Sequence, residues 1–168
     1  MLIGCDGPHN ADDYALDTVV NFGAQGDAER FRGEGWSHAE PAFTWALGPR
    51  ARLHMNVRWN SRPLGLRMRL AGMHHLPDLP FQTVEVAAND IVVATWQVAK
   101  TGDFTAVIPP DVLAKRRVLY LELRLANATS PKALGLTADS RPLGVSCFEM
   151  QLTKAVAPQD MWPQLAAR

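Results

Sequence analysis

The sequence predicts an all-β protein folded as an antiparallel β-sandwich. About eight short runs with strand character follow one another at spacings of roughly ten residues, and almost no run has the period of a helix. The chain has 168 residues, of which 47% are hydrophobic and 20% charged, which suits one globular domain with its own core. We expect this domain to span residues 14–153, after a lead-in at 1–13 and before a tail at 154–168.

Alternation of hydrophobic and polar residues is strictest between Arg52 and Trp59. The pattern resumes from Leu64 to Leu70, after a turn at residues 60–63. A period of two marks a strand with one buried face. Two such runs joined by a short loop predict an antiparallel hairpin, with the arginines on its outer face.

The remaining elements are shorter or less regular. Val118–Leu125 alternates most clearly among them, and a helical turn is expected at Pro109–Leu113. The alternation of the last strand breaks at Cys147-Phe148, which predicts a β-bulge or a switch of face. In chain order, the other expected strands are residues 18–22, 43–46, 81–88, 91–98, 104–108 and 143–152.

Charge is balanced over the whole chain and segregated locally. Seventeen basic and 17 acidic side chains leave no overall field to attract nucleic acid or an anionic membrane. Residues 1–49 hold eight acids against two arginines, whereas residues 50–69 hold six arginines and no acid. Either the two stretches lie side by side and neutralise each other, or the arginines form a surface for an anionic ligand.

Targeting and redox signals point to a cytoplasmic protein. No apolar run approaches the roughly 20 residues of a membrane-spanning helix, and the first residues lack the regions of a secretory signal. Leu2–Cys5 resembles a lipoprotein cleavage site without the hydrophobic segment that such a site needs. Two cysteines do not make a disulfide framework, and Cys147 is expected to be a buried hydrophobe.

Motifs of the common enzyme classes are absent from the sequence. It contains no glycine-rich phosphate loop, no GxSxG, no HExxH and no CxxC, so we assign no catalytic residues, no metal and no cofactor. The adjacent pair His74-His75 cannot chelate a metal alone. A carboxylate pair such as Glu34 with Glu40 leaves glycoside hydrolysis open as an alternative.

The segment from Gly33 to Gly48 has a composition suited to sugar binding. It contains Trp36, His38, Glu40 and Trp45 within a few residues of one another. An aromatic face covers the C–H side of a pyranose, while carboxylate and imidazole groups bond its hydroxyls. The alternative is that both tryptophans belong to the core.

A second segment, Ser130–Gly144, offers Asp139 and Arg141. Residues two apart in extended chain point to the same side, so the two can form a charge-assisted clamp. Such a clamp would hold the long connection to the sheet. Alternatively, both side chains would present hydroxyl-binding groups at an edge of the sandwich.

Together these segments resemble a family of β-sandwich domains found beside or fused to bacterial glycosyltransferases and polysaccharide-biosynthesis proteins. The matching features lie within residues 14–153, and no transferase domain accompanies them here. The resemblance implies a jelly-roll-like sandwich with an accessory, glycan-related role and no established catalytic residues. The features are Thr18–Gly23, Gly35–Glu40, Trp45 with Gly48, Ser130-Pro131, Leu134-Gly135 and Asp139–Gly144.

The leading hypothesis is a non-catalytic, carbohydrate-binding-like domain that assists synthesis or modification of a bacterial surface polysaccharide. Its ligand-binding residues would be Trp36, His38, Glu40, Trp45, Asp139 and Arg141. A second hypothesis is an interaction module that docks on a glycosyltransferase or self-associates, through an arginine face (Arg52, Arg58, Arg67, Arg69) or through Trp162. A third is an undetected hydrolase or lyase acting on glycans.

Overall fold

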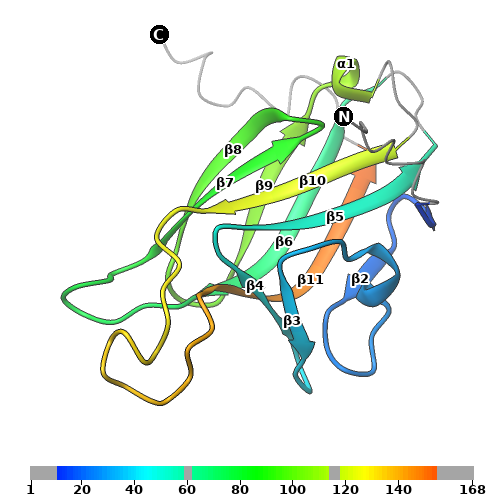
Figure 1. The fold of residues 1–168 in the computed structure, drawn as a ribbon. Coiled ribbons are helices and arrows are strands. Elements are labelled where there is room, and N and C mark those ends of the chain that lie inside the picture. Colours follow the sequence, from blue (N-terminus) through cyan, green and yellow to red (C-terminus); the bar gives the residue numbers. More distant parts are fainter. Residues whose placement is uncertain (1–10, 59–61, 114–117, 155–168) are drawn as a thin grey trace, which may run out of the picture.

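The computed structural model describes residues 11–58, 62–113 and 118–154, which form two packed β-sheets (Figure 1). One sheet has the strand order β1 (Asp13–Tyr14), β5 (Arg50–Val57), β10 (Val118–Leu125), β7 (Gln82–Ala88) and β8 (Ile91–Val98). The other has the order β3 (Trp36–Ala39), β4 (Thr44–Leu47), β11 (Leu143–Lys154), β6 (Leu64–Gly72) and β9 (Gly102–Ile108), and β2 (Val19–Asn21) also pairs with β11. A 3-10 turn at Ala28–Phe31 and α1 (Pro110–Leu113) are the helical elements of the described residues.

Each strand pair is antiparallel except the short β1–β5 pair, which is parallel. The prediction of an all-β, antiparallel, jelly-roll-like β-sandwich is therefore confirmed. None of the helices in the described part of the chain has the length and hydropathy needed to cross a membrane.

The core lies between the sheets and follows the alternation in the sequence. Leu53 and Met55 of β5 face Leu66 and Met68 of β6 across this interior, and all four are at most 1% exposed. Burial of such side chains contributes about 1.5–3 kcal/mol each, so the inward positions stabilise both sheets together.

The prediction of an antiparallel hairpin between residues 52 and 70 is wrong. Strand β5 lies in the five-stranded sheet, between β1 and β10, whereas β6 lies in the six-stranded sheet, between β11 and β9. The connection therefore crosses from one layer to the other. Alternation determines which face of a strand is buried but carries no information about the neighbouring strand. The inward side chain expected at Trp59 lies outside the described residues.

The irregularity expected near Cys147-Phe148 is a β-bulge. Along β11, Cys147 pairs with Leu70 and Glu149 pairs with Arg69, so Phe148 is the additional residue. The bulge keeps Cys147 inside the core and leaves Phe148 partly exposed. Burial raises the pKa of the Cys147 thiol, as expected of a cysteine that serves as a small hydrophobe.

The arginines of residues 50–69 do not form one face. Arg52 points outward from the five-stranded sheet, while Arg67 and Arg69 point outward from the other sheet. Only part of the charge is neutralised by the acidic N-terminal stretch: Glu34 lies 3.6 Å from Arg50 and 3.0 Å from Arg52. Asp103 of β9 instead pairs with Arg67 at 3.1 Å and with Arg69 at 3.4 Å.

Candidate ligand-binding site

The two segments singled out in the sequence meet at one end of the sandwich. The β3–β4 hairpin and the loop between β10 and β11 both lie at the end opposite to α1 (Figure 1). Strand β4 pairs with the start of β11, where Leu143 lies opposite Leu47. Residues about 100 positions apart in the sequence are therefore adjacent in space.

Trp36 packs against the hydrophobic core. Its indole Nε1 donates a hydrogen bond of 2.7 Å to the carbonyl oxygen of Arg52, which connects β3 to the opposite sheet. Its ring packs on Phe22 with the ring centroids 5.2 Å apart. Trp36 is partly exposed at its rim, but these contacts engage both its polar atom and its ring.

Trp45 faces away from the core. It lies on β4 between the inward, buried residues Thr44 and Ala46, and its side chain is partly exposed on the outer face of the six-stranded sheet. Its ring and that of Phe43 form a T-shaped pair with the centroids 5.6 Å apart, and the Phe43 ring lies 5.4 Å from that of Phe148. Trp45 is therefore part of a small aromatic group that remains partly exposed.

An irregularity in β3 turns His38 outward. The pairing of β3 with β4 shifts between Trp36 and Ala39, and the hydroxyl of Ser37 accepts a hydrogen bond of 3.2 Å from the backbone N–H of Trp45. His38 is left 71% exposed, with its Nε2 atom 3.3 Å from the Glu40 carboxylate. Imidazole and carboxylate therefore stand together on open surface beside β4.

Asp139 and Arg141 form the charge-assisted clamp anticipated from their spacing. The Arg141 guanidinium donates to the Asp139 carboxylate at 2.7 and 3.1 Å, and the Arg141 backbone N–H donates at 2.9 Å. Hydrogen bonds from Arg141, together with a smaller electrostatic effect of His38, lower the pKa of Asp139 to about 2. Asp139 raises the pKa of Arg141, as does the more distant Glu40.

The His38–Glu40 pair and the Asp139–Arg141 clamp lie on segments that flank the paired strands β4 and β11. We call His38, Glu40, Asp139 and Arg141 the polar cluster. Within it, the clamp partners satisfy one another, and Nη1 of Arg141 is enclosed with no hydrogen-bond partner among the described residues. The groups with most capacity to bond a ligand are therefore His38 and Glu40, while the Asp139–Arg141 clamp fixes the local conformation of its own loop.

A shallow hollow on the five-stranded sheet was not anticipated from the sequence. It has a volume of about 220 Å³ and is lined by Tyr120, Glu122, Arg52 and Asp90, with Leu121. Tyr120 packs beside His54, with the ring centroids 6.5 Å apart. The sequence shows these residues as outward-facing polar positions of two strands. Only the pairing of β5 with β10 brings them together.

Glu122 is the centre of charge in this hollow. Its carboxylate accepts hydrogen bonds of 2.7 Å from both Arg52 and Arg124, and only 12% of its side chain is exposed. Burial raises the pKa of Glu122, but the two arginines outweigh that effect and hold the pKa below its usual value. The charges of Glu122, Arg52 and Arg124 therefore satisfy one another within this hollow.

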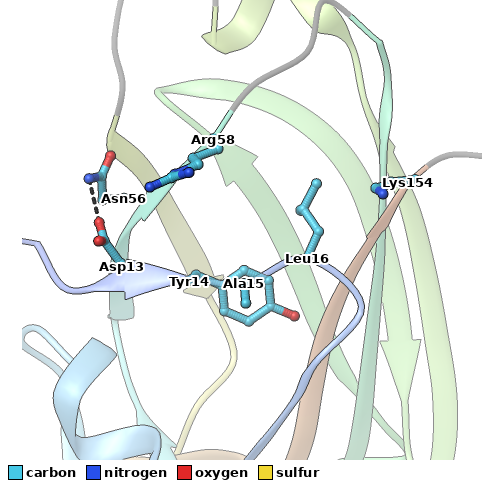
Figure 2. A pocket seen from close by; sticks show the side chains of 7 residues that line it. All are labelled: Asp13, Tyr14, Ala15, Leu16, Asn56, Arg58 and Lys154. Atoms are coloured by element: carbon cyan, nitrogen blue, oxygen red, sulfur yellow. Dashed lines mark hydrogen bonds between the residues drawn. The ribbon is translucent and has the colours of Figure 1, made fainter.

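A larger pocket, of about 540 Å³, lies near the ends of β5 and β11 (Figure 2). Its lining includes Arg58 and Lys154, which no sequence motif identified. No group of three or more histidine, cysteine, aspartate or glutamate residues suited to a metal ion occurs among residues 11–58, 62–113 and 118–154.

No protein-family model matches the chain, and no curated protein shows significant similarity to it. Solved structures similar to it include the CBM36-1 domain of a multidomain xylanase from the hindgut metagenome of Trinervitermes trinervoides (11% identity, TM-score 0.48, covering 83% of this chain and 98% of that one). A family 6 carbohydrate-binding module (9%, 0.49, 86% and 98%) and a family 35 module from an environmental isolate (12%, 0.40, 85% and 90%) are also similar. A similarity at this level does not extend to individual residues, so the site of this chain is defined by its own side chains.

Proposed function

We propose that this protein is a non-catalytic carbohydrate-binding β-sandwich that binds glycans beside Trp45. One observation carries the proposal: β4, with the partly exposed Trp45, pairs on one side with β3, which carries His38, and on the other with β11, which follows the Asp139–Arg141 pair. We call Trp45 and the polar cluster together the Trp45 surface.

The chemistry of this surface suits a sugar. The exposed part of the Trp45 ring offers an apolar surface to the C–H face of a pyranose. Glu40 accepts hydrogen bonds from hydroxyls, and His38 can donate or accept one. The surface can therefore bond sugar hydroxyls both as donors and as acceptors. Trp36, with its ring and its N–H already engaged, is a support for this surface rather than part of it.

Exposure of the candidate groups favours binding over catalysis. His38 is 71% exposed, so water has free access to the only imidazole–carboxylate pair of the surface. Hydrolases place their acid and base in sites that exclude solvent and shift pKa values. Glu34 was the second carboxylate of the pair considered for glycoside hydrolysis. It forms an ion pair with Arg52 at 3.0 Å and is not part of this surface.

The experiment is calorimetric titration of the full chain with neutral and acidic oligosaccharides at millimolar concentration. We expect weak binding that is lost in Trp45→Ala and weakened in His38→Ala. His74→Ala removes an exposed histidine of the loop after β6 and is the matched control. Binding that survives Trp45→Ala, or equal losses in both histidine variants, would refute this site.

The biological setting that we propose is an accessory role beside a glycosyltransferase in bacterial surface polysaccharide synthesis. Support for it is the order of the motifs from Gly35–Glu40 to Asp139–Gly144 in the sequence. A purified polysaccharide glycosyltransferase whose product binding or activity is unchanged by this domain would argue against that setting while leaving sugar binding intact.

Self-association is a second candidate function, and strand β8 favours it. This strand is the outer member of its sheet, and its eight residues contain no charge and no proline. Ile91 and Val92 are 49% and 47% exposed. Edge strands normally carry such protective residues; β8 has only a β-bulge at Val93, so its edge can pair with a second copy. A mass of twice the monomer by light scattering, returning to the monomer in Val92→Lys, would support this candidate.

A further inference from the structure

The pocket near the ends of β5 and β11 is built from three segments of the chain. Asp13, Tyr14, Ala15 and Leu16 come from β1 and the residues after it, and the other lining residues are Asn56, Arg58 and Lys154. Its volume of about 540 Å³ falls within the range of small-molecule sites, about 300–1,000 Å³. Figure 2 shows Arg58, which directly follows β5, and Lys154, the last residue of β11, with Leu16 between them in this view.

Two cations of this pocket have no acidic partner. Arg58 and Lys154 form no ion pair with any other residue in the described part of the chain. The outward arginines elsewhere on the sheets, such as Arg52 and Arg67, are paired with carboxylates. The guanidinium and the ammonium outnumber the single carboxylate of the lining, Asp13, so the pocket keeps a net positive charge that favours an anion.

The rest of the lining is held in place and offers different chemistry. The Asp13 carboxylate accepts a hydrogen bond of 2.6 Å from the Asn56 side chain, which leaves lone pairs for further donors. Tyr14 is 4% exposed, and its hydroxyl donates to the carbonyl oxygen of Thr18 and accepts from the backbone N–H of Leu152. Tyr14 is thus a fixed wall, and Leu16 supplies an apolar surface.

We propose that this pocket binds a small, hydroxyl-rich carboxylate, such as an aldonic or uronic acid. Arg58 and Lys154 take the carboxylate, Asp13 accepts hydrogen bonds from hydroxyl groups, and Leu16 contacts the carbon skeleton. A simple carboxylate would meet the same cations but would gain nothing from Asp13, whose charge repels it. The ligand class is therefore defined by the combination of cations, one anchored carboxylate and an apolar wall.

This site is separate from the Trp45 surface. The Asp139–Arg141 clamp precedes the first residue of β11, and Lys154 is its last residue. At about 3.3 Å per residue, the two ends of a twelve-residue strand are about 36 Å apart. Residue-resolved signals from the two sites therefore do not overlap, and either site can fail without the other.

The experiment follows backbone amide shifts of the full chain during titration with gluconate, glucuronate, glucose, acetate and inorganic phosphate. We expect gluconate and glucuronate to shift the amides of Ala15, Leu16 and Asn56, whereas glucose does not and acetate does so more weakly. Gluconate is an open-chain aldonic acid and glucuronate a cyclic uronic acid, so the comparison shows which of the two ligand classes the pocket prefers. Shifts confined to His38 and Trp45 would overturn the pocket proposal and leave the Trp45 surface standing.

Three substitutions sharpen the result. Arg58→Gln and Lys154→Gln should each weaken binding about tenfold, which corresponds to about 1.4 kcal/mol, the scale of one charge-assisted hydrogen bond. Arg62→Gln removes another exposed arginine that has no ion pair with a described residue, and it should change binding less than twofold, about 0.4 kcal/mol. Asp13→Asn should weaken glucuronate binding and strengthen acetate binding.

Several results would overturn the proposal. One is the absence of amide shifts around the pocket with either sugar acid at about 10 mM, a concentration that detects even weak sites. Another is an equal loss in Arg62→Gln, which would indicate general attraction to a basic surface. Phosphate binding as tight as glucuronate binding would replace a hydroxy-acid site by an unselective anion site.

Discussion

Replacing Trp36 by phenylalanine should destabilise the fold while leaving ligand binding at Trp45 in place. The substitution keeps an aromatic ring against Phe22 but removes the indole N–H that bonds the carbonyl oxygen of Arg52 at 2.7 Å. That bond joins the two sheets. Its loss should therefore lower the free energy of unfolding without changing the outer surface of the six-stranded sheet.

The expected magnitude follows from two contributions. The Arg52 carbonyl oxygen keeps a second donor, the Gly33 N–H at 2.8 Å, so it is not left unsatisfied and the lost bond costs only about 1 kcal/mol. The smaller ring removes about 40 Å² of apolar contact, worth about 1 kcal/mol more. A total of about 2 kcal/mol lowers the melting temperature of a domain of this size by about 4–8 °C.

Urea denaturation and calorimetry of Trp36→Phe and Trp45→Phe provide the comparison. Trp45 makes no side-chain hydrogen bond to a described residue and is partly exposed, so its replacement should cost less than about 1 kcal/mol and should weaken sugar binding. The reverse pattern, with a stable Trp36→Phe and a destabilised Trp45→Phe, would refute the assignment of one ring to the core and the other to the surface.

Three further predictions concern charge and burial. Glu122→Gln should lower the free energy of unfolding by about 1–2 kcal/mol at neutral pH, against less than about 0.5 kcal/mol for Glu149→Gln, whose one ion pair is 3.4 Å long. Because the pKa of Glu122 is lowered in the fold, this difference should begin to shrink in urea titrations below pH 4.5, the ordinary pKa of this carboxyl, and should be lost once the pH has fallen through the lowered pKa. The carboxyl of Asp139 should titrate at about 2 by NMR and move up toward 3.8 in Arg141→Gln, since the stabilising ion pair is lost only as the pH falls through the lowered pKa. Peptide mapping after thiol labelling should find Cys147 unmodified in the native protein, because burial raises the pKa of its thiol; rapid native labelling would contradict its enclosure.

The sequence predicted the long strands well because their buried faces alternate without interruption. Leu53 and Met55 in β5, and Leu66 and Met68 in β6, were assigned to the core from period alone, and all are buried. Their strands nevertheless lie in different sheets, since a short connection can turn back or cross over with the same alternation on both sides.

Short elements escaped prediction for a related reason. Strand β1 has two residues, too few to show a period. Strand β3 has four, and its pairing shifts within Trp36–Ala39, so its side chains do not alternate regularly. The same shift turns His38 outward. The irregularity that removes the sequence pattern of β3 therefore also exposes this side chain.

The candidate sites divide in the same way. Residue types clustered within one segment, such as Trp45 with His38, could be recognised from the sequence. That the segment containing Asp139 lies at the same end of the sandwich depends on the pairing of β4 with β11, which only the fold reveals. The pocket containing Arg58 and Lys154 left no local signal, because these residues are single polar positions at the ends of two separate strands.

Residue-resolved NMR titration of the full chain with neutral and acidic oligosaccharides tests glycan binding by this protein most directly. The predicted result is a saturable shift of the His38, Trp45 and Arg141 signals, with those of the β8 edge unchanged. Signals that do not move with any oligosaccharide at millimolar concentration, or that move only away from Trp45, would contradict it.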